Sequence, residues 1–137
     1  MDEIVQMFYK AGRFEDALGE AARWGDIESI VELIKLGINP NCKTSLGSFP
    51  LKLAASGGQL EAIKLLLSHG ADPNSTNEDG EHSVFACLWA RHSREVYLAC
   101  CSELIRHGAR TDMVNKSALS VEALAMRRGL TLEELTT

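Results

Sequence analysis

The sequence predicts an all-helical solenoid, a stack of short helix pairs in which each pair packs against the next. Residues 49–76 have the pattern of two short helices joined at Gly57-Gly58. The same pattern occurs 33 residues upstream, and part of it occurs again downstream. The chain of 137 residues is 45% hydrophobic but has only four Phe, two Tyr and two Trp. This composition suits thin layers of aliphatic side chains rather than one large core.

Residues 49–76 form the most regular unit. Pro50 suits the first turn of a helix, where its missing N–H is no loss. Gly70 stands just past the second helix, at a position that favours glycine, and Asp72-Pro73-Asn74 begins a turn. The apolar residues of the second helix at helical spacing are Leu60, Ile63, Leu66 and Leu67. Neither helix can bury its apolar side alone, so the unit requires neighbours that resemble it.

Those neighbours are visible as an internal repeat. Two segments upstream of the regular unit align with it at a constant offset of 33 residues, and a short downstream segment matches its second helix. The aligned segments are 21–28 with 54–61, 33–41 with 66–74, and 104–109 with 66–71. A period of 33 residues is typical of ankyrin repeats. The chain therefore resembles an ankyrin-repeat protein over roughly residues 11–137.

The resemblance implies a single ankyrin-repeat domain over residues 1–137. The expected units are an N-terminal capping helix at 1–12, repeats at about 11–43, 44–76 and 77–114, and a capping repeat at 115–137. Asp2, Asp26 and Ser93 are each suited to cap the helix that follows, and Thr131 begins a capping-box pattern for the last one. The alternative for the first twelve residues is an amphipathic arm that binds a partner.

Two repeats depart from the family pattern Gly-x-Thr-Pro-Leu-His. In the second repeat Phe49 replaces Thr and Lys52 replaces His, so the hydroxyl–imidazole hydrogen bonding of the family cannot form, and we expect Phe49 to fill that space. The third repeat has His82-Ser83-Val84-Phe85 at this place, and it is five residues longer than the second. The extra residues fall within 91–101 and extend either a helix or the loop before it. An extended binding face and a neutral extension are both open.

Charge and composition limit the classes of partner. The net charge is −5, which disfavours general binding to nucleic-acid phosphates. Residues 1–37 hold eight acidic and four basic residues, which either attract a basic partner or form a solvated helix face. No apolar run approaches the ~18 residues of a membrane helix, and the N-terminus lacks the pattern of a signal peptide. We therefore expect a cytoplasmic chain that is monomeric alone and does not bind membranes.

The sequence contains no recognisable catalytic or metal-binding motif. It has neither a phosphate-binding glycine loop nor a Gly-x-Ser-x-Gly turn, and His69 and His107 stand beside equivalent helix-end glycines. A pair formed by Cys87 and His92 lacks a third, orienting group. The four cysteines lack C-x-x-C spacing, which indicates free structural thiols in a reducing compartment. We expect no enzyme activity, no cofactor and no metal.

The resemblance implies a protein-binding module whose concave groove, made by finger loops and inner helices, holds one partner. An adaptor or scaffold is the leading interpretation. A dedicated inhibitor, such as a bacterial immunity protein that neutralises a toxin, is the second. The third is a structural fragment of a longer repeat array, against which the polar last repeat and the atypical first helix argue.

Aligning the repeats by their glycines places four residue pairs at the end of the inner helix, which borders the groove in similar proteins. The pairs are Arg23-Trp24, Ser56-Gly57, Trp89-Ala90 and Arg127-Arg128. Both tryptophans fall in or beside this row together with several arginines, the residue types that most often anchor interfaces. Acidic and hydroxyl residues of the fingers complete the predicted groove. The predicted partner-binding residues are Arg23, Trp24, Ser45, Ser56, Glu78, Asp79, Glu81, Trp89, Arg91, Arg127 and Arg128.

Overall fold

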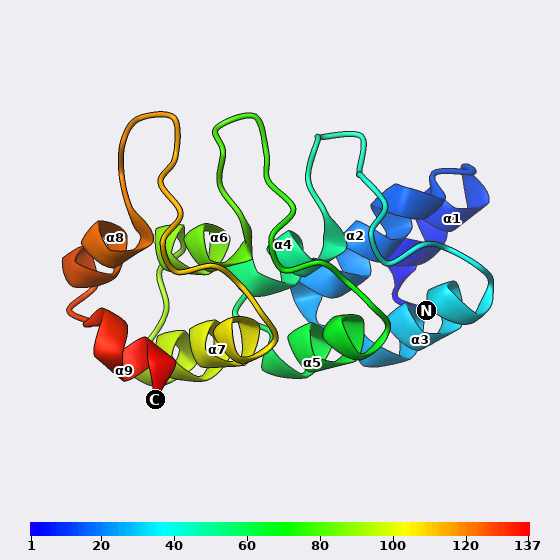
Figure 1. Ribbon diagram of the computed structural model, residues 1–137. Coiled ribbons are helices and arrows are strands. Elements are labelled where there is room, and N and C mark those ends of the chain that lie inside the picture. The colour runs from blue at the N-terminus through cyan, green and yellow to red at the C-terminus, as the bar shows by residue number, and fades with distance from the viewer.

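The computed structural model describes all 137 residues, which form nine helices and no strand (Figure 1). One isolated bridge joins Val114 and Ser120. The helices are α1 (Glu3–Lys10), α2 (Phe14–Trp24), α3 (Ile27–Lys35), α4 (Pro50–Ser56), α5 (Leu60–Ser68), α6 (Ser83–Trp89), α7 (Arg94–Arg106), α8 (Val121–Arg127) and α9 (Leu132–Thr136). The predicted all-helical solenoid is confirmed.

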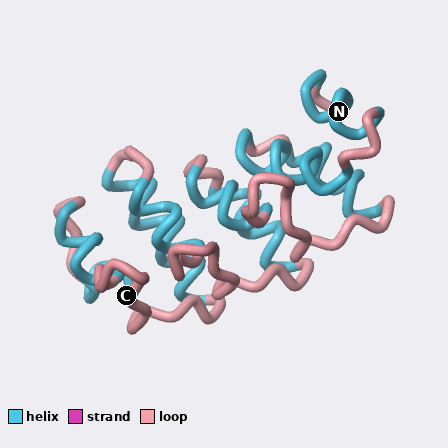
Figure 2. Tube along the Cα trace, turned by 90° about the horizontal axis from the view of Figure 1, so that it is seen from above, coloured by secondary structure: helices cyan, strands magenta, loops and turns pink.

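The helices form two layers. The inner layer consists of α2, α4, α6 and α8, and the outer layer consists of α3, α5, α7 and α9 (Figure 1). Successive helix pairs follow one another along the stack, as the view from above shows (Figure 2). Three fingers, residues 44–48, 77–81 and 115–119, project beyond the inner layer, and each is closed by a hydrogen bond from its first N–H to its last carbonyl. Hollows lie between these fingers and the inner helices.

The first helix packs along α2 at the N-terminal end of the inner layer. The Asp2 carboxylate accepts a hydrogen bond from the N–H of Ile4, so the predicted cap is present. Val5 is buried against the core. The N–H of Asp2 also donates to Asp26, which caps α3, so the two helix starts are joined.

Asparagines join the first repeat to the second and the second to the third. The side chain of Asn41 donates to the Gly70 carbonyl at 2.9 Å and accepts from the Asp72 N–H at 2.7 Å. Asn74, 33 residues further on, makes the same two bonds to Gly108 and Arg110. Backbone groups of one loop are thus satisfied by a side chain of the preceding repeat, which fixes the spacing of the stack.

The carboxyl ends of the inner helices α2, α4 and α6 are also satisfied by the next repeat. Gln59 donates to the Arg23 carbonyl at 3.2 Å, and His92 Nε2 donates to the Ser56 carbonyl at 2.9 Å. Arg128 plays this part for α6, since it donates to the carbonyls of Leu88 and Trp89 at 2.6 and 3.0 Å. These bonds pair carbonyls that a helix end leaves without partners.

The five extra residues of the third repeat lie away from the fingers. Helix α7 has 13 residues whereas α5 has nine, and the connection before α7 has four residues, 90–93, whereas that before α5 has three. Ser93 caps α7 as predicted. Arg94, the first residue of α7, donates to the Gly129 carbonyl at 2.9 Å and forms an ion pair with Glu134. The insertion therefore supports the C-terminal end of the stack.

All four cysteines are free, as predicted. Cys87, Cys100 and Cys101 are buried between α6 and α7, and Cys42 is half-buried. Burial, followed by the charge of Glu15, raises the pKa of the Cys42 thiol to about 11. Hydrogen bonding to Cys87 and burial raise the pKa of Cys100 as well. Because the thiolate is the reactive form, these two thiols act as packing groups.

Candidate partner-binding groove

Three hollows lie in a row between the fingers and the inner helices. The first hollow, of about 150 Å³, lies between α2 and the first finger, and the last, of about 690 Å³, lies between the second and third fingers. The middle hollow, of about 200 Å³, lies over α4. The first and middle hollows share Ser48 and Leu53, while the middle and last share Glu81 and Trp89. The three hollows therefore form one continuous groove.

Each inner helix contributes one residue of the predicted row to this groove. Arg23 lines the first hollow, Ser56 the middle one, Trp89 both the middle and the last, and Arg127 the last. The residue that follows each of them in the sequence does not line a hollow. The structure thus divides the aligned pairs, because only the first member of each pair points to the groove.

The second members of the pairs have other surroundings. Trp24 is 67% exposed, and its indole N–H donates to Glu20 at 2.6 Å. Arg128 is committed to the carbonyls at the end of α6. Arg91 is exposed on the connection between α6 and α7 and lines none of the three hollows.

Trp89 and Glu81 form the centre of the groove. Trp89 is 44% exposed, and its indole N–H donates to Glu81 Oε2 at 2.7 Å. Glu81 is only 8% exposed, and the same oxygen accepts from the Asn115 amide at 2.8 Å. The indole ring is therefore held in one orientation with part of its surface open to solvent, as an interface anchor requires.

The fingers carry the other predicted residues. Ser45 is tied to α2, because its N–H and hydroxyl both donate to Asp16 and its hydroxyl also accepts from Arg13. Burial alone would raise the pKa of Asp16, but these bonds from Ser45 and the Arg13 guanidinium hold it below its usual value. Asp79 lines the last hollow, whereas Glu78 is exposed and lines none of the three.

Sequence reasoning missed the lysine of the groove. Lys52 lines the middle hollow and is only 7% exposed. The sequence identified it only as a departure from the family histidine. A signal was available, because Lys52 stands four residues before Ser56 and therefore on the same side of α4. Asn77 and Asn115, whose side chains close the fingers and line the groove, were also missed.

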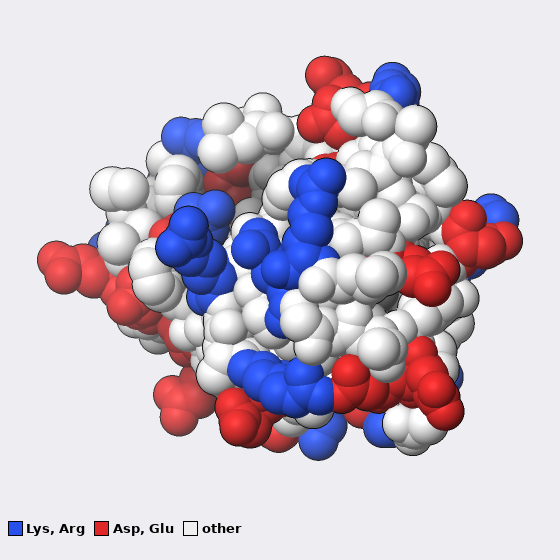
Figure 3. Space-filling view, turned by 90° about the vertical axis from the view of Figure 1, so that its left-hand side faces the viewer, with Lys and Arg blue, Asp and Glu red and all other residues white.

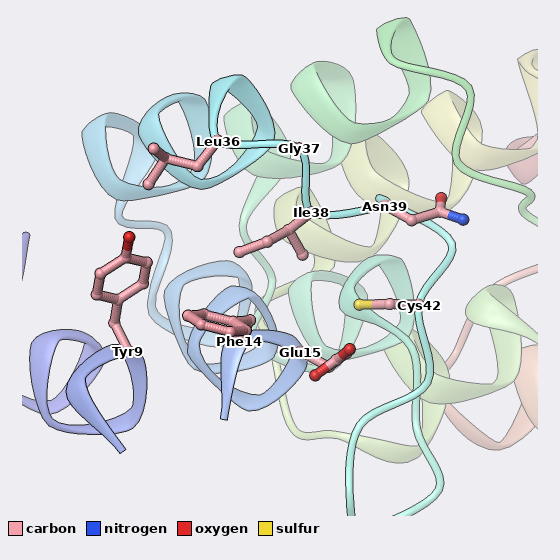
Figure 4. A pocket seen from close by; sticks show the side chains of 8 residues that line it. All are labelled: Tyr9, Phe14, Glu15, Leu36, Gly37, Ile38, Asn39 and Cys42. Atoms are coloured by element: carbon pink, nitrogen blue, oxygen red, sulfur yellow. The ribbon is translucent and has the colours of Figure 1, made fainter. Parts of the chain in front are cut away.

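A separate pocket of about 450 Å³ lies at the N-terminal end of the stack (Figure 4). The side chains of Tyr9, Phe14 and Ile38 surround it together with Leu36, which follows α3. Glu15 and Cys42 lie at its edge (Figure 4). No sequence pattern predicted this pocket, because its wall comes from α1, α2 and the loop after α3, which meet only in the fold.

At the opposite end of the stack, Lys and Arg side chains gather over the middle of the face that α8 and α9 form (Figure 3). Two of the arginines of this region are already engaged, Arg94 with Glu134 and Arg128 with backbone carbonyls.

No three His, Cys, Asp or Glu side chains come together in a way that could hold a metal ion. No helix combines the length and apolar character that crossing a bilayer requires.

Comparison with known proteins agrees with this architecture. A 67-residue stretch is 34% identical to 2-5A-dependent ribonuclease of Mus musculus, covering 48% of this chain and 9% of the relative. A longer stretch of 112 residues is 32% identical to ankyrin repeat, SAM and basic leucine zipper domain-containing protein 1 of Loxodonta africana. It covers 80% of this chain and 23% of that relative. Protein phosphatase 1 regulatory subunit 27 of Homo sapiens is 37% identical over 65 residues, covering 47% and 42%.

The chain spans less than half of the length of each of these relatives. Residues 18–115 match the family described as ankyrin repeats (3 copies). This range includes α3 to α7, most of α2 and the first two fingers. The chain belongs to the ankyrin-repeat family.

Proposed function

We propose that this chain is a non-catalytic adaptor or scaffold module that holds one protein partner in its groove. Ankyrin repeats are generally protein–protein interaction modules. One relative is named as a regulatory subunit of protein phosphatase 1. The partner of that relative is not assigned to this chain, because a shared fold alone does not specify a partner.

The observation that carries the proposal is the row of Arg23, Ser56, Trp89 and Arg127 along one continuous groove. Each repeat contributes one side chain, so a partner that lies along the stack meets all four. Trp and Arg supply most of the binding energy at many interfaces when they are central and well supported. Trp89 has that support, because Glu81 and Asn115 hold its position.

A comparison of bait variants tests the proposal. Native lysate is passed over the full chain, over Arg23→Ala/Trp89→Ala and over Met126→Ala, and the captured proteins are quantified by mass spectrometry. Met126 is 65% exposed and lines none of the three groove hollows, so it is a matched surface truncation. We expect one protein to be captured by the wild type and by Met126→Ala and to be lost from the groove variant. Equal capture by all three baits would contradict groove binding.

A further inference from the structure

The middle hollow contains an unusual lysine. Lys52 is 7% exposed, yet it forms none of the ion pairs of the chain, and its ammonium group donates no hydrogen bond to another residue. The only fully buried side-chain nitrogen or oxygen without a hydrogen-bond partner is His82 Nδ1, so the Lys52 nitrogen keeps contact with the open hollow. A charge held this deeply without a partner is costly, because it has lost water and gained no counter-ion.

Three further donors line the same hollow without partners. The hydroxyls of Ser48 and Ser56 make no hydrogen bond within the chain, although the backbone groups of both residues do. The amide oxygen of Asn77 accepts from the N–H groups of Asp79 and Glu81, which leaves its NH₂ group free. One small space therefore collects an ammonium, two hydroxyls and an amide, all able to donate.

The acidic group of this hollow does not satisfy Lys52. Glu81 lies on its wall, but its Oε2 is held by Trp89 and Asn115, and the carboxylate forms no ion pair with Lys52. The other buried carboxylate of the chain, Glu103, is paired with Arg106 and His107. Burial lowers the pKa of Lys52, although the charges of Glu81 and Asp79 act in the opposite direction. The net effect in the free protein is that the ammonium is destabilised by its surroundings.

We propose that the middle hollow is a receptor for an acidic side chain of the protein partner, whose carboxylate pairs with Lys52 and accepts from Ser48, Ser56 and Asn77. A space of about 200 Å³ suits a short side chain. Hydrogen bonds between ionised partners are the strongest that proteins form, and they gain most where water is excluded. This inference rests on the proposed function, because it identifies which part of the partner enters the groove.

The first test uses the free protein. In Lys52→Met the aliphatic stem remains and the charge is removed. We expect its melting temperature to rise above that of the wild type. Lys64→Met is the matched control, because Lys64 is exposed on α5 and forms an ion pair with Glu61, and it should not raise the melting temperature. A lower melting temperature for Lys52→Met would show that the ammonium stabilises the fold, and would overturn the proposal.

The second test uses peptides selected from a random displayed library against the immobilised full chain. We expect the selected sequences to share one Asp or Glu. Replacing that residue with Asn or Gln should weaken binding to the wild type about tenfold or more, as measured by fluorescence anisotropy. The same replacement should have little effect on binding to Lys52→Met and its full effect on binding to Lys64→Met.

The outcomes separate the two proposals. If the selected peptides lose binding to Trp89→Ala but have no acidic preference, the groove function stands and the acidic receptor is wrong. If a shared acidic residue acts equally on Lys52→Met and the wild type, the carboxylate binds elsewhere and the receptor is again wrong. If Trp89→Ala binds every selected peptide unchanged, or if no peptide is enriched, the groove function itself is contradicted.

Discussion

The second and third repeats use the same contacts with their neighbours but differ in their outer layer. Asn41 and Asn74 join each to the preceding repeat with the same pair of hydrogen bonds. Gln59 and His92, at equivalent positions, both donate to the carboxyl end of the preceding inner helix. Although these contacts between repeats are the same, α7 is four residues longer than α5.

The difference shows where a repeat can change length without disturbing the groove. Inner helices α4 and α6 both have seven residues, so the groove face keeps its spacing. The added residues of α7 lie in the outer layer, where Arg94 contacts Gly129 and Glu134 next to α9. The sequence left an extended binding face and a neutral extension open. These contacts instead give the insertion a supporting role at the C-terminal end of the stack.

The largest expected effect tests whether the two repeats share one core. Leu66 and Leu104 occupy equivalent positions in α5 and α7, and both are fully buried. We expect Leu66→Ala and Leu104→Ala each to reduce the free energy of unfolding by about 2–5 kcal/mol in urea titrations. Single, coincident transitions by circular dichroism and fluorescence would show one cooperative unit. An unchanged midpoint for either variant would mean that its repeat contributes no core.

A smaller effect tests the asparagine contacts between successive repeats. Asn74→Ala and Asn41→Ala each remove two hydrogen bonds between successive repeats. We expect each to cost about 1–3 kcal/mol, and the two costs to agree closely, since the geometry is the same. A large loss for one variant beside no loss for the other would show that the two junctions are not equivalent.

The cap of the long helix is expected to be worth less. The Ser93 hydroxyl accepts from the Val96 N–H at the start of α7, whereas α5 has no side-chain cap. Ser93→Ala should cost about 1 kcal/mol in thermal or chemical unfolding, while Ser93→Thr, which keeps a hydroxyl, should cost less. Equal stability of Ser93→Ala and the wild type would mean that the packing of α7 alone determines where it begins.

A pH-dependent effect distinguishes the third repeat from the second. His82 stands at the position of Phe49, is fully buried and donates from Nε2 to the Arg110 carbonyl. Burial, and then the charges of Lys52 and Arg110, lower its pKa below 6.5, against the bond to Arg110. The histidine therefore binds a proton more readily in the unfolded chain than in the folded one. The contribution of neutral His82 to the free energy of unfolding is fully present above the pKa of the unfolded chain, and it is lost as the pH falls below that pKa.

We expect the wild type to lose stability between about pH 7.5 and about pH 5.5, and His82→Phe to lose less over this interval. Asp16 and Asp26 do not interfere, because their pKa values are held below 3.8 and their contribution is lost only at lower pH. The free energy of unfolding of both proteins is measured by urea titration at each pH. Parallel profiles would show that protonation of His82 does not cause the loss of stability in this pH interval.

The smallest expected effect on stability concerns the tryptophans. Trp24→Ala and Trp89→Ala should each leave the free energy of unfolding within about 1 kcal/mol, because Trp24 is 67% and Trp89 44% exposed. Trp89→Ala should abolish partner binding, whereas Trp24→Ala should not, because Trp24 lines none of the three hollows. Tryptophan emission in the free wild type should be quenched by acrylamide. Emission that is blue-shifted and resists quenching would contradict the exposure of the rings.

Local sequence signals determined the repeat architecture. The constant 33-residue offset between aligned segments identified the family. The caps at Asp2, Asp26, Ser93 and Thr131 could be predicted because each side chain bonds to a backbone group within three residues. The burial of Leu66 followed from helical spacing. Such signals survive in one sequence because they act over a single helical turn.

Only the tertiary structure decided what faces the groove. In the row of aligned pairs, Trp89 and Arg127 point into it while Arg128 turns back to the end of α6. The same is true of Lys52, whose burial without a counter-ion depends on fingers that come from two different repeats. These features arise from contacts between residues about 30–40 positions apart. The repeat pattern sets which residues are equivalent, but neighbouring repeats determine which partner each side chain meets.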